Sequence, residues 1–234
     1  MRYADWQGSI TMATAIFDLD GTIADTLIDL GDAVNHGLEQ LGCPVHEYEA
    51  YKKMVGNGAK KLCFRALSDD KKDKAQELHK LFSEYYGTHY LEKTRLYDGI
   101  RETLERLADN GAVLAVATNK PEKFAVEIIR KLLPDIRFIR VLGGNEKRLP
   151  KPDVSIIEEI LAEIPDERNA VYMIGDSNVD IQTAKNAGIK SIGCAWGFRG
   201  HSELEAEGAD SIAEKPSDIA DIILNSTSKI KSAE

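Results

Sequence analysis

The chain has 234 residues, of which 43% are hydrophobic, a size and composition typical of a globular protein with a substantial core. Its formal net charge is -9 and its sequence pI is near 5.2. This balance argues against a partner such as nucleic acid or an anionic membrane, because binders of both need a basic surface. The three cysteines, Cys43, Cys63 and Cys194, are widely spaced and form no C-x-x-C pair, so we expect buried free thiols.

The N-terminal residues lack an apolar stretch of the length that a signal peptide needs. No later run approaches the length of a membrane span. We therefore expect a cytoplasmic protein with no membrane partner. Strand-like character begins only at Ala13, so residues 1–11 are interpreted as an N-terminal tail.

Residues 13–17 form an apolar run that predicts the first strand, and this run ends in Asp18-Leu19-Asp20-Gly21-Thr22. Alternate side chains of an extended chain point the same way, so Asp18 and Asp20 could approach one site. Two like charges at such a short distance need a counter-charge. A divalent metal, a lysine or a bound proton could supply it, and each would make the pair reactive.

A helical pattern follows the first strand. Apolar residues at intervals of three or four predict one long amphipathic helix that stops at Gly42. Residues 45–95 contain no convincing strand and are predicted as further helices around the turn Gly56-Asn57-Gly58. We interpret residues 24–95 as an all-helical insert after the first strand, which forms a second unit.

From residue 96 onward, helical and strand patterns alternate to the end of the chain. Apolar runs predict strands at residues 113–117, 138–142, 171–174, 189–194 and 210–213. Strands that are apolar throughout, separated by amphipathic helices, are typical of a parallel sheet covered on both faces. The sequence thus predicts a doubly wound, Rossmann-like α/β core of residues 12–23 and 96–228.

Polar residues follow the predicted strands at four places. They are Asp18 and Asp20, then Thr118 and Asn119, then Lys151, and finally Asp176, Ser177 and Asp180. Ligands of open parallel sheets bind beyond the carboxyl ends of the strands, so these residues are candidates for one site. The set suits phosphoryl transfer, because carboxylates can hold Mg2+ while a lysine and a hydroxyl hold phosphate oxygens. One carboxylate could be the nucleophile and a second the general acid and base.

These segments resemble the four motifs of the haloacid dehalogenase superfamily. The matching residues are Asp18-Leu19-Asp20-Gly21-Thr22, Thr118, Lys151-Pro152-Asp153 and Gly175-Asp176-Ser177-Asn178-Val179-Asp180, in that order. The helical insert after the first motif is similar to the cap of the phosphoglycolate phosphatase-like branch, which implies that residues 24–95 form a helical cap whose glycine turn faces the core. The resemblance implies a Mg2+-dependent phosphatase that hydrolyses a small phosphorylated metabolite, phosphoglycolate first among the candidates, through an aspartyl phosphate.

The resemblance also implies roles for single residues. Asp18 would be the nucleophile, and Asp20 would be the general acid and base with its backbone carbonyl on the metal. Asp18 and Asp176 would bind Mg2+ through their carboxylates. Asp180 would support them by holding Lys151 or a metal-bound water.

Further residues are implied to hold the substrate. Thr118 and Lys151 would bind the phosphate, helped by the backbone amides of Leu19 and Asn119. In the cap, Asn57 and Arg65 are candidates for substrate specificity. Arg65 could equally pair with a carboxylate of the cap.

Two other functions fit parts of this pattern. A sugar phosphomutase of the same superfamily would use the same aspartyl phosphate but release little inorganic phosphate. A phospho-accepting signalling domain also joins acidic residues, a hydroxyl and a lysine on a parallel sheet, but it resembles a shorter and uninterrupted fold. We expect a monomer, with a homodimer as the alternative.

Overall fold

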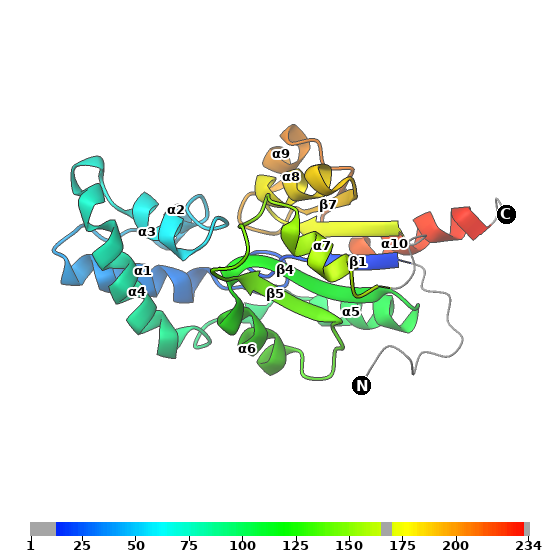
Figure 1. The fold of residues 1–234 in the computed structure, drawn as a ribbon, viewed down its shortest axis with the longest axis horizontal. Helices are drawn as coiled ribbons and strands as arrows, with labels where there is room; N and C mark the ends of the chain where they lie inside the picture. Colours follow the sequence, from blue (N-terminus) through cyan, green and yellow to red (C-terminus); the bar gives the residue numbers. More distant parts are fainter. Residues whose placement is uncertain (1–12, 165–169, 232–234) are drawn as a thin grey trace.

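The computed structural model describes residues 13–164 and 170–231, so the tail predicted at residues 1–11 lies outside it. Six parallel strands form one sheet in the order β5, β4, β1, β6, β7, β8 (Figure 1). Their bounds are β1 Ala13–Phe17, β4 Val113–Pro121, β5 Arg140–Gly144, β6 Ala170–Gly175, β7 Lys190–Cys194 and β8 Ser211–Ala213. All five residues of β1 are buried, as a central strand with helices on both sides requires.

Helices cover both faces of this sheet. Those that pack on one face are α5 (Ile100–Asp109), α6 (Glu122–Leu132) and α10 (Pro216–Lys231), and those on the other are α7 (Ser155–Leu161) and α8 (Asn178–Ala187). Successive side chains of β1 point to opposite faces, so Phe17 joins the first layer and Ile16 the second. The predicted doubly wound α/β core is confirmed.

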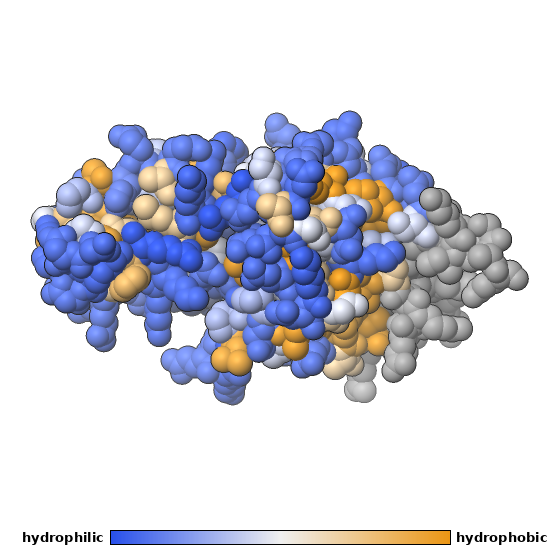
Figure 2. All heavy atoms as spheres, turned by 90° about the horizontal axis from the view of Figure 1, so that it is seen from above, coloured by the Kyte–Doolittle hydropathy of each residue, from blue (hydrophilic) through white to orange (hydrophobic). Residues whose placement is uncertain are grey.

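The segment between β1 and α5 is helical and lies beyond one end of the sheet, on the left of Figure 1. It contains α1 (Leu27–Gln40), α2 (Tyr48–Tyr51), α3 (Ala59–Ala66), a 3-10 helix at Asp69–Lys74 and α4 (Ala75–His89). These elements share a hydrophobic cluster, to which the core adds Phe124 of α6 and, at its edge, the partly buried Phe198. The outer face of this cap is mostly hydrophilic in the view of Figure 2. The helical cap is confirmed, and the domain boundaries stay a prediction.

The two segments that connect the core with the cap pair as a small antiparallel ladder. Here β2 (Ala24–Asp25) pairs with β3 (Arg95–Leu96), and Asp25 Oδ2 lies 3.3 Å from a guanidinium nitrogen of Arg95. The prediction that no strand occurs up to residue 95 is therefore wrong at its end. A ladder of two residues per strand shows no periodicity, and its partner strand is distant in sequence.

Three further elements differ from the prediction. Strand β4 runs beyond residue 117 to Pro121, and β5 spans Arg140–Gly144 instead of residues 138–142. Glycine has low strand propensity, so the end of β5 at Gly143 and Gly144 gives no strand signal in the sequence. The short helix α9 (His201–Ala206) was not predicted.

Two expectations from composition can also be checked. Cys43, Cys63 and Cys194 are all buried and free, as expected. Across residues 13–164 and 170–231, no helix combines the length and apolar character that crossing a membrane requires.

Candidate functional site

Three buried carboxylates meet at the carboxyl end of the sheet. Asp18 directly follows β1, Asp176 directly follows β6, and Asp180 lies in the first turn of α8. Each offers an oxygen, and these atoms lie within 4.8 Å of one another. The parallel topology places these side chains together although their residues are far apart in sequence.

Glycines make room for this acidic cluster. Gly21 has φ +83°, and a side chain there would collide with the Asp176 carboxylate. A Cβ atom on Gly197 would collide with Asp176 and would lie 2.5 Å from the carbonyl oxygen of Gly21. The loop after β7 therefore closes over Asp176, and the backbone amide of Phe198 donates a 2.7 Å hydrogen bond to Asp176 Oδ2.

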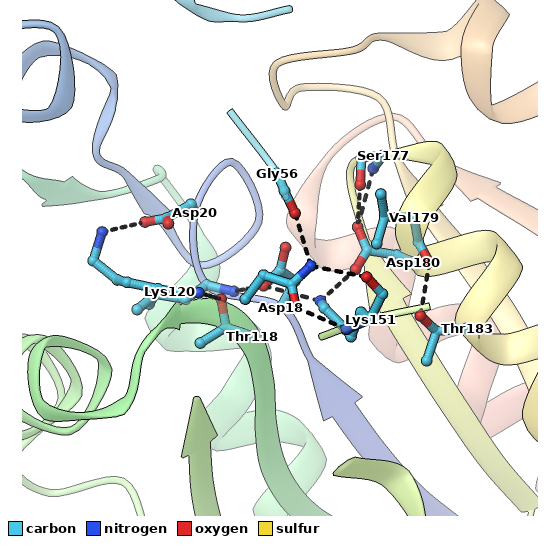
Figure 3. A network of polar contacts seen from close by, with 12 residues as sticks. Asp18, Asp20, Gly56, Thr118, Lys120, Lys151, Ser177, Val179, Asp180 and Thr183 are labelled. Atoms are coloured by element: carbon cyan, nitrogen blue, oxygen red, sulfur yellow. Dashed lines mark hydrogen bonds and ion pairs between the residues drawn. The ribbon is translucent and has the colours of Figure 1, made fainter. Parts of the chain in front are cut away.

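Lys151 lies between two of the carboxylates. Its Nζ atom is 2.6 Å from Asp180 Oδ1 and 3.2 Å from Asp18 Oδ1 (Figure 3). Asp18 Oδ1 also accepts a 2.7 Å hydrogen bond from the backbone amide of Leu19, and the Thr118 hydroxyl donates to the same carboxylate. The predicted phosphate ligands Leu19, Thr118 and Lys151 are thus gathered around Asp18.

Asp180 has both of its carboxylate oxygens engaged. Oδ1 accepts from Lys151, and Oδ2 accepts from the amide and hydroxyl of Ser177 at 3.2 and 2.7 Å in the capping box of α8. Asp180 therefore supports Lys151, as expected. Within the described chain, no lysine or arginine nitrogen lies within 4.0 Å of Asp176, so its charge has no close partner.

The charges of this cluster favour a bound cation. Burial raises the pKa of Asp18 to about 6, against the opposing effect of Lys151. Burial, reinforced by repulsion from Asp180 and Asp18, raises the pKa of Asp176 well above its usual value. A divalent cation would relieve this repulsion, and carboxylate oxygens are the hard ligands that Mg2+ prefers. The residues present therefore fit a divalent metal held by Asp18 and Asp176.

Asp20 is held apart from that cluster. Its Oδ1 atom accepts hydrogen bonds from Thr26 Oγ1 at 2.8 Å and from Lys120 Nζ at 2.9 Å. In Figure 3 the pair of Asp20 and Lys120 lies on the opposite side of Asp18 from Asp180. The Asp20 carboxylate is thus outside the acidic cluster, which agrees with a part in proton transfer and not in carboxylate ligation of the metal.

Lys120 was not singled out by sequence reasoning. Its side chain is 1% exposed, and its pKa is raised because attraction by Asp20 outweighs the penalty of burial. A signal for it exists: Lys120 directly follows the predicted site residues Thr118 and Asn119 at the polar end of β4.

Asn119 joins three parts of the site through its side chain. Oδ1 accepts from the backbone amide of Lys151 at 2.8 Å, while Nδ2 donates to the carbonyl oxygens of Lys151 and Gly56 at 3.1 and 3.0 Å. The contact with Gly56 confirms that the glycine turn of the cap faces the core site (Figure 3).

Asn57 and Arg65 contact each other. Arg65 donates to Asn57 Oδ1 at 2.7 Å and to the Met54 carbonyl at 2.8 Å. Neither residue lines the cavity between cap and core. In this structure they brace the glycine turn, and their contact with substrate stays a prediction.

That cavity connects the reacting groups with the cap. On the core side it is lined by Asp18, Asp20, Thr118, Asn119 and Lys120. On the cap side the lining is mainly apolar and includes Leu30, Val55, Ala59, Leu62, Phe82 and Tyr86. A small leaving group next to Asp20 would therefore lie against the cap.

The family model for haloacid dehalogenase-like hydrolases matches residues 15–194, which hold all of these carboxylates and lysines. The chain belongs to the haloacid dehalogenase-like hydrolase family. This confirms the resemblance and the prediction of a hydrolytic enzyme.

Relatives within the family are similar over most of the chain. A phosphoglycolate phosphatase from Vibrio parahaemolyticus is 33% identical over 214 residues, covering 88% of this chain and 94% of the relative. One from Haemophilus influenzae is 34% identical over 190 residues, covering 78% and 85%. A solved structure of a candidate phosphoglycolate phosphatase from Lactobacillus delbrueckii superposes with a TM-score of 0.84 at 29% identity, covering 92% of this chain and 99% of that one.

Proposed function

We propose that this enzyme, a phosphatase of the haloacid dehalogenase-like family, hydrolyses a small phosphomonoester through a phosphorylated Asp18 with Mg2+ as cofactor. The observation that carries the proposal is the arrangement around Asp18, a buried carboxylate beside the Lys151 ammonium and the acidic cluster. A nucleophile, a fixed cation and a metal site at one point suit attack on a dianionic phosphate.

Asp18 and Asp176 are the residues that would hold the metal. When bound, a divalent cation supplies positive charge that offsets the repulsion between Asp18 and a phosphate and stabilises the charge of the transition state. Lys151 adds a second positive charge beside Asp18 and is held there by Asp180.

The first half of the reaction would transfer the phosphoryl group to Asp18. A carboxylate oxygen of Asp18 attacks phosphorus, and the bond between phosphorus and the ester oxygen breaks. A protonated Asp20 gives its proton to that oxygen, so the product leaves with a neutral hydroxyl group. Thr118 and Lys151 hold the phosphoryl oxygens during this transfer.

The second half would restore the enzyme. The ionised Asp20 takes a proton from a water molecule that attacks the phosphorus of the aspartyl phosphate. The bond between phosphorus and Asp18 breaks, and inorganic phosphate leaves. Asp18 is again a carboxylate and Asp20 again carries a proton, so atoms and charges balance over the cycle.

Phosphoglycolate is the proposed substrate, because relatives that align over most of this chain bear the name phosphoglycolate phosphatase. The test measures phosphate release from phosphoglycolate, pyrophosphate, a sugar monophosphate and a nucleotide, with and without Mg2+. Mg2+-dependent release with phosphoglycolate preferred is expected. Release that occurs only with a bisphosphate activator would instead indicate a mutase, and a stable phosphoprotein without turnover a signalling domain.

A further inference from the structure

Two polar groups lie in the otherwise apolar part of the cavity. Leu62, Phe82 and Phe124 line it, and the polar groups among them are the Tyr86 hydroxyl and the Lys120 ammonium. Of the remaining polar lining residues, Asp18 and Thr118 act on the phosphate, Asp20 carries the proton, and the Asn119 side chain is engaged with Lys151 and Gly56. Tyr86 and Lys120 therefore need a separate explanation.

Tyr86 comes from α4 of the cap, and its side chain is buried against Phe82 and Phe124. The Lys120 ammonium lies close to its hydroxyl, and among the described residues no acceptor takes the hydroxyl's own proton. A buried donor that is not used is costly, and most such groups in proteins are satisfied. An unsatisfied hydroxyl in a cavity wall is available to a ligand.

Lys120 comes from the end of β4, across the cavity from the cap. Its ammonium lies 4.9 Å from the centre of the Tyr86 ring and 2.9 Å from Asp20 Oδ1. An ammonium has three donors: one goes to Asp20 Oδ1, and the Tyr86 hydroxyl lies within reach of another. A donor therefore remains for a further acceptor near Tyr86.

Two arginines of the surrounding loops and helices, Arg65 and Arg199, have their own hydrogen-bond partners. Arg65 donates to Met54 and Asn57 within the cap, and Arg199 donates to the Val55 carbonyl at 2.8 Å. Neither arginine lines the cavity. Lys120 is thus the cation available to an anion on the leaving group, among the lining residues that the structure describes.

We propose, resting on the phosphatase function above, that Lys120 Nζ and Tyr86 Oη bind a carboxylate on the alcohol part of the substrate. The apolar walls strengthen such a charged contact, because they exclude water from around it. The site accordingly selects phosphate esters of hydroxy acids over esters of neutral alcohols.

The geometry also limits how long that alcohol can be. Asp20 must reach the ester oxygen to protonate it, and Lys120 binds the same carboxylate of Asp20. The ester oxygen and the substrate carboxylate must therefore lie within a few bonds of each other. This favours esters of short 2-hydroxy acids, the class to which phosphoglycolate belongs.

The experiment compares phosphoglycolate with n-propyl phosphate, a neutral ester of similar length, by kcat/KM for phosphate release. The wild type is expected to prefer phosphoglycolate. In Tyr86→Phe the kcat/KM for phosphoglycolate should fall roughly 10- to 100-fold, mainly through KM, because one hydrogen bond to a charged group is lost. The value for n-propyl phosphate should fall much less.

A matched control is Tyr172→Phe. Tyr172 is also a buried tyrosine with an unsatisfied hydroxyl and a lysine over its ring, that of Lys190 at 5.5 Å, but it does not line the cavity. The Tyr172→Phe enzyme should prefer phosphoglycolate over n-propyl phosphate to the same extent as the wild type. An independent measurement on the wild type itself is inhibition of n-propyl phosphate hydrolysis, which glycolate should cause and 1-propanol at equal concentration should not.

The outcomes separate this inference from the function on which it rests. If the wild type hydrolyses both esters equally well, or Tyr86→Phe keeps the full preference, the carboxylate site is wrong while the phosphatase stands. If Arg65→Gln abolishes the preference and Tyr86→Phe does not, the anion binds at the cap turn instead. If neither ester nor any other monoester is hydrolysed, the proposed function itself fails.

Discussion

Two buried lysines lie in the site, and their surroundings differ. Lys151 is paired with two carboxylates, Asp180 and Asp18, that come from the sheet core. Lys120 is paired with one, Asp20, and its other side faces the Tyr86 ring of the cap. The half of the site that would handle phosphate is thus built entirely by the core, whereas the half next to the leaving group is shared with the inserted helices.

This difference assigns the reaction to the residues around Lys151 and the choice of substrate to the residues around Lys120. Residues around Lys151 are fixed by mutual hydrogen bonds and can serve any phosphate ester. Those around Lys120 depend on side chains of the cap, which can change without disturbing the core. Each prediction below tests one side of this division, beginning with the largest expected effect.

Replacing Asp18 by Asn should abolish turnover, with kcat at least about 10⁴-fold lower, because an amide cannot form the phosphorylated intermediate. Phosphate release from an aryl phosphate measures this without dependence on the cap pocket. Circular dichroism serves as the folding control, since Lys151 keeps its bond to Asp180 in the variant. A folded Asp18→Asn protein with substantial activity would contradict the nucleophile assignment.

Asp20→Asn should lower kcat by roughly 10²- to 10⁴-fold, the usual contribution of a general acid and base. Because the Asp20 carboxylate lies outside the cluster of Asp18, Asp176 and Asp180, this variant should bind Mg2+ about as well as the wild type. Titration calorimetry measures the affinity. Asp176→Asn is the comparison and should bind Mg2+ much more weakly; the reverse order would place the metal elsewhere.

Lys151→Met should destabilise the protein more than Lys120→Met. Removing one partner of a buried ion pair costs about 3–5 kcal/mol, because the remaining charge is left uncompensated. Loss of Lys151 leaves two buried carboxylates without their cation. Loss of Lys120 affects only Asp20, which is 12% exposed and keeps its hydrogen bond to Thr26. Urea unfolding of both variants without metal tests the order. Equal losses would show that the two lysines are held alike.

The metal-free protein should become more stable as pH falls from 8 to 5.5. Folding raises the Asp18 pKa from 3.8 to about 6 through burial, so this group's contribution is complete below pH 4 and is lost as pH rises through 6. The expected gain between pH 8 and 5.5 is on the order of 1 kcal/mol, and the larger part of the total of about 3 kcal/mol appears between pH 6 and 4. The difference between wild type and Asp18→Asn isolates it from other groups, such as His79, whose pKa is lowered by burial.

Saturating Mg2+ supplies the internal check on that pH dependence. The cation favours the ionised carboxylates, so it should raise the melting temperature most at high pH and reduce the gain on acidification. Thermal unfolding at several pH values with and without Mg2+ measures both effects. A pH dependence that Mg2+ leaves unchanged would mean that the cluster does not bind the ion.

The sheet and the residues around Lys151 were predictable from sequence for a physical reason. Continuous apolar runs mark buried strands, and polar residues directly after them must meet where the strands end. Asp18, Lys151 and Asp176 could therefore be identified as site residues from the sequence alone. The distances between them and their shared burial could not be predicted.

The residues around Lys120 were harder to predict because their contacts follow no periodicity. Lys120 and Asp20 are 100 residues apart, and the Tyr86 ring reaches them only because α4 packs where it does. Asn57 of the glycine turn and Arg65 of α3 show the converse: both were candidates for substrate contact, yet they hydrogen-bond each other. Side chains at an interface between two packing units are set by tertiary structure, which local pattern does not encode.

The small ladder of β2 and β3 has a consequence for the architecture of the enzyme. Ala24 is paired with Leu96, so the chain leaves and re-enters the core at points only about 5 Å apart. A two-residue hairpin turn would close that gap. The cap is therefore a module that can be shortened, enlarged or exchanged as one piece, and grafting caps of related enzymes between Asp25 and Arg95 is a direct route to new substrate ranges on one reaction centre.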